Sequence, residues 1–398
     1  MRTPSCPRRG VLLSLVPLLV APAAALAVYA PIPEQDQGKA LLVRLGASVY
    51  HDSNIFGSAT GEVDSMVYSV APGISYNGSL SDQTFLSAGY DLAYDHVADR
   101  PGKQNLTSHT LSVRLAHAFS DATSIDVSDR YQISKNPQSL LAGVPLNTDQ
   151  SFKMNEFNAR FATAANAKTG LVFKVRHAAM AYDVAALATQ LDRDEALAGV
   201  EASFALLPET KLVGEYRYLD VAYDRGGALK DKRSHFVLAG VDHNPGQQLT
   251  LSARGGLEDR TREGAGDTTS PYVELSARYA YAEASFLSGG YSYTIEEPSD
   301  VVRFTDSKVS RLFVNLQHRL SGLVTASGSL TFEPAQLQGR AGVADVDERT
   351  TRLGLALSWT PSPNWRVSAT LDFDRVASDD ANRDQSRDRM GVNAQFSF

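Results

Sequence analysis

The stretch YHDSNIFG, residues 50–57, contains the residue types of a hydrolase site: a serine nucleophile, a histidine base and an aspartate. A nucleophile and its base must come within about 3 Å of each other, and a third group must orient the base. In an extended strand, His51 and Ser53 share one side about 6.6 Å apart, while Asp52 points to the other side. Consecutive residues therefore make a poor catalytic triad, and a structural role for this run is the stronger interpretation.

The first 27 residues have the three parts of a secretory signal peptide. Three arginines and no acidic residue precede the apolar run VLLSLVPLLVAPAAALA, which ends in small residues. We expect Sec-dependent export, cleavage after Ala27 and a short periplasmic segment over 28–39. Cys6 is the one cysteine of the sequence and precedes the apolar run, so the mature chain would contain neither a disulfide nor the lipidated cysteine of a lipoprotein.

The predicted mature chain is acidic, which argues against nucleic acid as a partner. Removal of Arg2, Arg8 and Arg9 changes the formal net charge from -7 to about -10, and nucleic-acid binding relies on positive charge. Nothing after residue 27 approaches 18 consecutive apolar residues, so the sequence predicts no membrane-spanning helix. A chain of this kind can span a membrane only as a closed barrel.

Side chains alternate between apolar and polar from residue 40 onward, which is the period of a half-buried strand. In WRVSATLDFDR, Trp365 and Val367 share one face, whereas Arg366 and Asp372 share the other. About 18 such segments, with 16 as the alternative, predict an all-β transmembrane antiparallel outer-membrane barrel over residues 40–398. The predicted strands are 40–51, 64–79, 83–96, 106–119, 122–134, 152–165, 169–183, 193–207, 210–224, 231–243, 247–260, 271–281, 284–296, 306–320, 323–333, 347–360, 364–377 and 387–398, with the register least certain over 193–243 because both faces there are apolar.

The connections between the predicted strands alternate between long and short. Tight turns such as SLSD, SDA, NAK and PSPN are interspersed with polar loops such as TREGAGDTTS and ASDDANRDQS. This layout is typical of a bacterial outer-membrane barrel with its short turns in the periplasm. A secreted sandwich would need a second sheet over its apolar face. We therefore expect a multi-pass barrel in the outer membrane of a Gram-negative bacterium, in contact with outer-membrane lipids and lipopolysaccharide.

Two runs and the last strand resemble known patterns. Asp52-Ser53-Asn54-Ile55-Phe56 and the PGISY run of the second strand resemble the β-barrel porin type 2 family, whose members are often associated with exopolysaccharide or capsule gene clusters. The resemblance implies a barrel and polysaccharide export proteins as partners, but no catalytic residue. It also implies that Asp, Ser and Asn of DSNIF cap backbone groups at a strand end. Pro72, within the second strand, predicts a bulge or a local kink. The alternating end of the chain, with Phe396 and Phe398, resembles the signal read by the barrel assembly machinery.

Eighteen strands enclose a lumen wide enough to hold water. If the more apolar face of each strand contacts lipid, fourteen cations and eight anions lie on the opposite face. Rings of Arg and Lys bias pores toward anions, which predicts a porin-like conduit for export or passage of exopolysaccharide or anionic solutes; charges that only pair across strands are the alternative. The predicted pore-lining residues are Arg44, Asp91, Arg114, Asp126, Arg130, Glu156, Arg160, Lys174, Arg176, Glu201, Arg254, Glu258, Arg260, Glu274, Arg278, Arg311, Arg319, Arg352, Arg366, Asp372, Asp374 and Arg389.

Two other functions remain open from the sequence. A barrel enzyme that hydrolyses lipid or peptide would need a serine, a histidine and a carboxylate together. The eight histidines are scattered, and His117, His177 and His318, on the apolar face, have no adjacent serine in the same row. A structural or adhesive surface barrel would act through its loops, which have ordinary lengths. No loop has a metal-ligand spacing such as DxDxDG, so we expect no metal and no cofactor. The favoured expectation is a pore without enzymatic activity.

Overall fold

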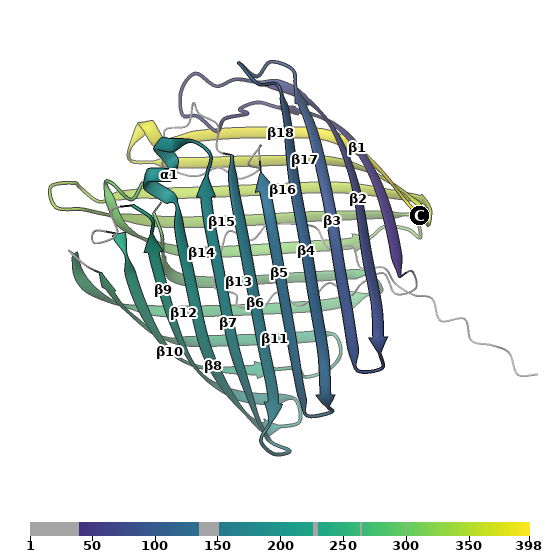
Figure 1. Cartoon of the computed structure of the whole chain (residues 1–398), viewed down its shortest axis with the longest axis vertical. Helices are drawn as coiled ribbons and strands as arrows, with labels where there is room; N and C mark the ends of the chain where they lie inside the picture. The colour runs from purple at the N-terminus through teal and green to yellow at the C-terminus, as the bar shows by residue number, and fades with distance from the viewer. Residues whose placement is uncertain (1–39, 135–150, 226–229, 263–264, 299) are drawn as a thin grey trace, which may run out of the picture.

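The computed structural model describes residues 40–134, 151–225, 230–262, 265–298 and 300–398. The predicted signal peptide and the segment 28–39 lie outside the described residues. The described residues form one antiparallel sheet of eighteen strands (Figure 1). The strands are β1 (Leu41–Asp52), β2 (Ser65–Ser81), β3 (Thr84–Val97), β4 (Asn105–Ser120), β5 (Thr123–Ser134), β6 (Phe152–Ala164), β7 (Thr169–Tyr182), β8 (Arg193–Leu207), β9 (Thr210–Tyr223), β10 (Lys232–His243), β11 (Leu249–Arg262), β12 (Ala265–Ala282), β13 (Ser285–Glu296), β14 (Phe304–Arg319), β15 (Val324–Gly339), β16 (Val346–Ser362), β17 (Trp365–Ser378) and β18 (Gln385–Ser397).

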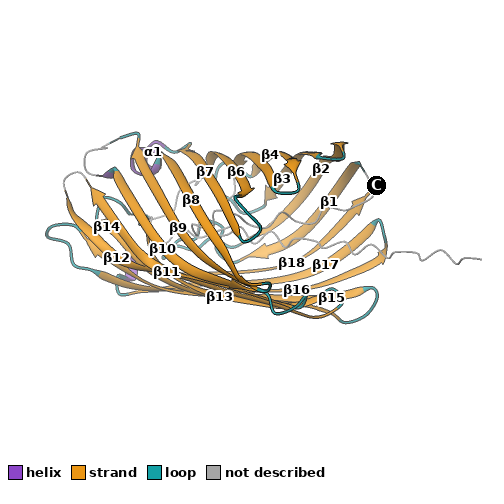
Figure 2. Cartoon of the chain, turned by 90° about the horizontal axis from the view of Figure 1, so that it is seen from below, coloured by secondary structure: helices purple, strands orange, loops and turns teal. Residues whose placement is uncertain are grey.

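Each strand pairs with the next one along the chain, and β1 also pairs with β18. The sheet is therefore a closed barrel without an unpaired edge, as the alternation predicts. Seen in Figure 2, the strands curve around an interior space. The predicted fold class and the predicted count of eighteen strands are confirmed.

Two strands are considerably longer than predicted. β12 begins at Ala265, six residues before the predicted start, and β15 continues to Gly339, six residues beyond the predicted end. The additional residues, AGDTTS and PAQLQG, are rich in Gly and polar residues and adjoin Pro271 or include Pro334, so their sequence resembles that of a loop. They nevertheless pair with their neighbours, for example Pro334 with Arg349, because a strand outside the hydrocarbon layer needs no apolar face.

Large apolar side chains point outward around the barrel. Val237 and Leu257 are 65% and 56% exposed, and Leu45, Leu111 and Leu371 are exposed in the same way. Such a band would be unfavourable in water, but it matches the apolar belt of a transmembrane barrel. The opposite face of each strand points to the interior and carries most of the charged residues.

The bulge predicted at Pro72 is wrong. Leu45 of β1 pairs with Pro72 in a regular register. On the other side, Val70 pairs with Tyr94 and Gly73 with Asp91, so the same register holds before and after the proline. Pro72 has no N–H to donate, and the pairing with β3 is interrupted at this point without an inserted residue.

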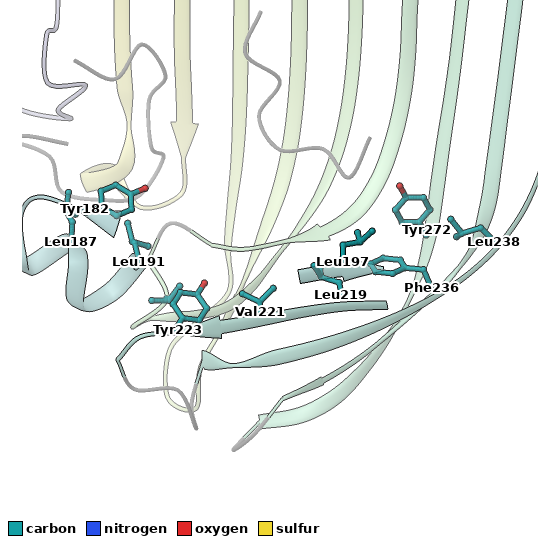
Figure 3. Close-up of a cluster of buried hydrophobic side chains, with 11 residues drawn as sticks. Tyr182, Leu187, Leu191, Leu197, Leu219, Val221, Tyr223, Phe236, Leu238 and Tyr272 are labelled. Atoms are coloured by element: carbon teal, nitrogen blue, oxygen red, sulfur yellow. The ribbon is translucent and has the colours of Figure 1, made fainter. Parts of the chain in front are cut away.

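A short helix, α1 (Ala185–Leu191), lies in the connection between β7 and β8. Its Leu187 and Leu191 are buried in an apolar cluster together with Tyr182 and Tyr223 (Figure 3). The cluster continues along the inner faces of strands between β8 and β12, with Leu197, Leu219, Val221, Phe236, Leu238 and Tyr272, and it also includes Val301 of the connection between β13 and β14. Both faces of this region are therefore apolar because one faces outward and the other packs inside the barrel. Among the described residues, no helix is long and apolar enough to cross a bilayer.

Candidate functional site: the charged inner wall

The structure places every predicted pore-lining residue on the inward face of its strand. The register shows this directly: Arg44 of β1 pairs with Gly73 of β2, which pairs with Asp91 of β3. Paired residues in an antiparallel ladder point to the same side of the sheet. The same ladder continues through Arg130 and Glu156, which pair between β5 and β6.

One part of the inner wall holds ion pairs that are accessible to solvent. Arg44 Nη2 lies 2.8 Å from Asp91 Oδ1, with side-chain exposures of 29% and 52%. Arg114 donates from Nε and Nη2 to the two oxygens of Asp126, at 2.9 and 2.6 Å. We call these four residues the exposed wall. Their charges sit where water or a passing solute reaches them.

Gly73 makes the Arg44–Asp91 pair possible. The two charged residues belong to β1 and β3, and the glycine lies between them on β2. A Cβ atom at position 73 would lie 2.3 Å from Asp91 Oδ1 and 3.4 Å from Arg44 Nε. The glycine of the PGISY run therefore leaves room for an ion pair that crosses an intervening strand.

In another part of the inner wall, beginning on β7, the charged groups are nearly excluded from solvent. Lys174 Nζ contacts Glu201 Oε2 at 2.7 Å and Glu215 Oε1 at 3.0 Å. Arg217 donates twice to Glu215, both at 2.8 Å, and also to the hydroxyl of Tyr272 at 3.2 Å. Here the carboxylate of Glu215 has multiple charged partners, which is the arrangement that a buried charge requires.

A second buried group lies toward the long-loop rim. Arg260 donates to Glu258 at 2.9 Å, to Asp306 at 2.9 Å and to the carbonyl of Ile295 at 2.9 Å. Asp306 also pairs with Arg262. We call the residues Lys174, Glu215, Arg217, Glu258, Arg260 and Asp306 the buried wall.

Glu297, in the connection between β13 and β14, joins this buried group from above. It pairs with Lys232 and accepts a hydrogen bond of 2.6 Å from the hydroxyl of Tyr223. Burial by itself would raise the pKa of Glu297, but the positive charges of Lys232 and Arg260 hold this pKa at about 2. The connection is thus fixed against β9 and β10, several strands away from its own.

Sequence reasoning missed several charged residues of the inner wall. Within the described residues, these add nine carboxylates and six cations, so the excess of fourteen cations over eight anions falls from six to three. The spacing of these residues in the sequence could have identified them. For example, Glu215 and Arg217 are two residues apart on one predicted strand and therefore share a face. The missed residues are Asp52, Asp95, Glu195, Glu215, Asp242, Glu296, Asp306, Glu333, Glu348, Arg193, Lys211, Arg217, Lys232, Arg262 and Arg387.

The DSNIF run does not assemble a catalytic triad. Asp52 pairs with Arg387, and Ser53 Oγ accepts a hydrogen bond from the backbone N–H of Asp388. His51 Nε2 instead lies 3.6 Å from Asp64 Oδ2. The serine, the histidine and the aspartate therefore have separate partners, and the hydrolase alternative loses its best candidate residues.

The two apolar residues of the same run, Ile55 and Phe56, serve packing. Ile55 is buried in a cluster with Val67, Val97 and Leu106, and Phe56 packs against that cluster. At the other end of the chain, the ring of Phe396 lies 5.1 Å from that of Trp365 and 5.7 Å from that of Phe398. Recognition of Phe396 and Phe398 by the barrel assembly machinery stays a prediction.

A depression of about 270 Å³ lies at the short-turn rim. It is lined by the turn between β2 and β3 and by Phe85, Ser124, Asp126 and Arg160. Hydroxyl, carboxylate and guanidinium groups beside an aromatic ring are chemically suited to contact sugars. Among the described residues, no group of three or more His, Cys, Asp or Glu side chains is arranged to hold a metal ion.

The closed barrel, its outward apolar band and its charged interior define a porin-like outer-membrane barrel. Residues 42–398 match the family described as Putative beta-barrel porin 2, and the chain belongs to that family. No curated protein sequence matches it significantly.

Several solved structures of outer-membrane proteins are similar to this chain. OpdK of Pseudomonas aeruginosa, solved with vanillate, superimposes with a TM-score of 0.51 at 12% identity, over 90% of this chain and 99% of that one. A ferric enterobactin receptor (PfeA) mutant of Pseudomonas aeruginosa gives a TM-score of 0.47 at 11% identity, over 91% and 81%. The copper transporter OprC gives 0.44 at 13% identity, over 84% and 63%.

Proposed function

We propose that the protein is a non-enzymatic outer-membrane pore for anionic solutes, and that its cargo is an acidic exopolysaccharide. The observation that carries the proposal is the cation excess on the inward faces of the described strands, among which the guanidinium groups of Arg44 and Arg114 are accessible to solvent. On the inward faces of the described strands, cations outnumber anions by three. Fixed guanidinium groups attract anions and orient carboxylates by paired hydrogen bonds.

The depression at the short-turn rim supports the same function. Phe85 and the polar groups of Asp126 and Arg160 give an entering sugar chain both an apolar ring face and hydrogen-bonding partners. In this proposal, the protein reaches the outer membrane through Sec-dependent export and the barrel assembly machinery. Polysaccharide export proteins then deliver the polymer to the short-turn rim.

Planar-bilayer recordings test the pore. With a salt gradient across the bilayer, we expect a reversal potential that shows anion preference. An acidic oligosaccharide added on one side should block the current at concentrations where a neutral glucose oligomer of the same length does not. A cation-selective reversal potential, or equal block by both oligomers, would contradict the proposal.

A deletion strain tests the cargo. Loss of the gene should reduce surface exopolysaccharide, and the wild-type gene should restore it. Unchanged polysaccharide in the deletion strain would remove the export assignment while leaving the pore itself intact.

A further inference from the structure

The junction between β1 and β18 differs from the other strand junctions of the described barrel. Every other pair of neighbouring strands is consecutive in the chain, whereas β1 and β18 come from its two ends. Nine residue pairs join them, from Arg44 with Ser397 to Asp52 with Arg389, compared with twelve between β1 and β2. Because the entropic cost of bringing two segments together grows with their separation, this seam is the junction that local turns do not help to form.

An ion pair excluded from solvent lies at the long-loop end of the seam. Asp52 accepts hydrogen bonds from Arg387 Nε at 2.9 Å and from Nη2 at 2.5 Å. The two side chains are 0% and 3% exposed. Asp52 Oδ1 also accepts from the backbone N–H of Asn54 at 3.1 Å. The pair is bidentate and excluded from solvent. Removal of either side chain would therefore leave a buried, unpaired charge and destabilise the fold.

The next two residues continue the contact by means of their side chains. The backbone N–H of Ser53 donates to the carbonyl of Asp388 at 2.9 Å, and the N–H of Asp388 donates to Ser53 Oγ at 2.8 Å. The serine hydroxyl thus accepts the hydrogen bond that a backbone carbonyl would accept in a regular strand pair. Asn54 Nδ2 donates to the carbonyl of Ser386 at 3.0 Å. Three consecutive residues therefore meet three consecutive residues of β18.

The segment that supplies these groups is held in place from behind. Asn54 Oδ1 accepts from the N–H of Ser58 at 3.0 Å, and Asn54 Nδ2 donates to the carbonyl of Ser58 at 2.8 Å. Gly57 lies between them with a φ of 59°, which a glycine adopts without strain. Ile55 anchors the same turn in the apolar cluster that includes Val67 and Val97. The polar groups therefore have fixed positions before β18 meets them.

We propose that Asp52-Ser53-Asn54 is a docking site for Ser386-Arg387-Asp388, and that this seam clasp locks the barrel shut. The other end of the seam is held differently, by two backbone hydrogen bonds between Val43 and Phe398 at 2.9 and 3.0 Å. Backbone hydrogen bonds can form with any residue, whereas the clasp accepts only the residues of β18 whose charge and shape match it. It thereby sets the correct register of the last strand and prevents the seam from opening toward lipid.

The first test compares charge variants of the clasp in the purified full-length barrel. Asp52→Asn and Arg387→Gln should each lower the temperature at which the barrel unfolds in an electrophoretic heat-modifiability assay. The reversal Asp52→Arg with Arg387→Asp should recover at least half of the loss. Arg254→Gln is the matched control, because Arg254 of β11 forms a bidentate pair with Asp242 of the consecutive strand β10, at 2.8 and 2.9 Å. A control that loses as much as Asp52→Asn would overturn the proposal.

The second test separates seam closure from a defect in the turn alone. Ser48 and Asn393 are direct partners across the seam, and Cys6 is the one native cysteine. A Ser48→Cys, Asn393→Cys disulfide should restore the stability of the Asp52→Asn barrel, and under reducing conditions the rescue should disappear. If the disulfide forms but Asp52→Asn remains as unstable as before, Asp52 acts only within its own turn and the clasp is refuted.

Discussion

The exposed wall and the buried wall have similar residue types but very different surroundings. In the exposed wall, the side chains of Arg44 and Asp91 are 29% and 52% exposed. In the buried wall, Arg217 and Glu215 are 5% and 1% exposed. An exposed pair contributes little to stability because water and salt screen it, whereas a buried pair must satisfy both charges fully. The same alternating pattern thus produces charged groups that a solute can reach in one part of the inner face and a structural lining in another.

The cause of the difference is the material that packs beside the buried wall. The apolar cluster of α1 and β8 to β12 lies on this side of the interior. Glu297 brings the β13–β14 connection against Tyr223 and Lys232. These groups exclude water from the neighbouring charges. We therefore expect permeating solute to follow the exposed wall.

The largest effect should come from breaking the buried wall. Arg260→Gln leaves Glu258 without its guanidinium partner, so unfolding in urea should show a loss of about 3–5 kcal/mol. Arg44→Gln is the matched change in the exposed wall and should cost about 0–1 kcal/mol. Equal losses in the two variants would show that the walls do not differ in this way.

The pH dependence of Glu297 should give the next largest effect. Its folded-state pKa of about 2 lies below that of an unfolded glutamate. Its stabilisation is therefore complete above about pH 4.5 and is lost as the pH falls through 2, with a full value of about 3 kcal/mol. The difference in unfolding free energy between wild type and Glu297→Gln should be constant from pH 7 to 5 and shrink below pH 4.5. A difference that grows on acidification would contradict this assignment.

Ion selectivity should respond to the exposed wall. Arg44→Gln and Arg114→Gln each remove a cation and leave a carboxylate accessible to solvent, so reversal potentials should shift toward cations. A unit charge acting at a few Å through water is worth about 1 kcal/mol, which allows a change in permeability ratio of up to about fivefold. Lys174→Gln, in the buried wall, should shift selectivity much less. A larger shift for Lys174→Gln would place the solute path along the buried wall.

The smallest effect is expected at a pair between loops. Arg303 donates to Asp380 at 2.7 Å, with side-chain exposures of 41% and 17%. The hydrogen bond from Arg303 lowers the pKa of Asp380. Asp380→Asn should reduce stability by less than about 1 kcal/mol, and urea titrations should show that the difference vanishes at high salt. A loss that persists at high salt would mean that Asp380 has another role.

The sequence predicted the barrel because lipid imposes a strict period of two. Trp365 and Arg366 could be assigned to opposite faces without knowledge of any neighbour. Burial was not predictable in this way, because Arg44 and Arg260 both occupy inward positions of alternating strands. The burial of Arg260 depends on tertiary packing that brings Glu297 to 3.6 Å from its Nη1. The partner of Asp52 was hidden for a related reason, since Arg387 lies at the other end of the chain.

The length of β12 has a consequence at the cell surface. Its 18 residues, at about 3.4 Å each and a tilt of about 40°, reach about 47 Å along the membrane normal. The apolar band of such barrels is only about 25 Å tall. Much of the strand must therefore stand outside the hydrocarbon layer, as a rigid, hydrogen-bonded extension of the barrel wall.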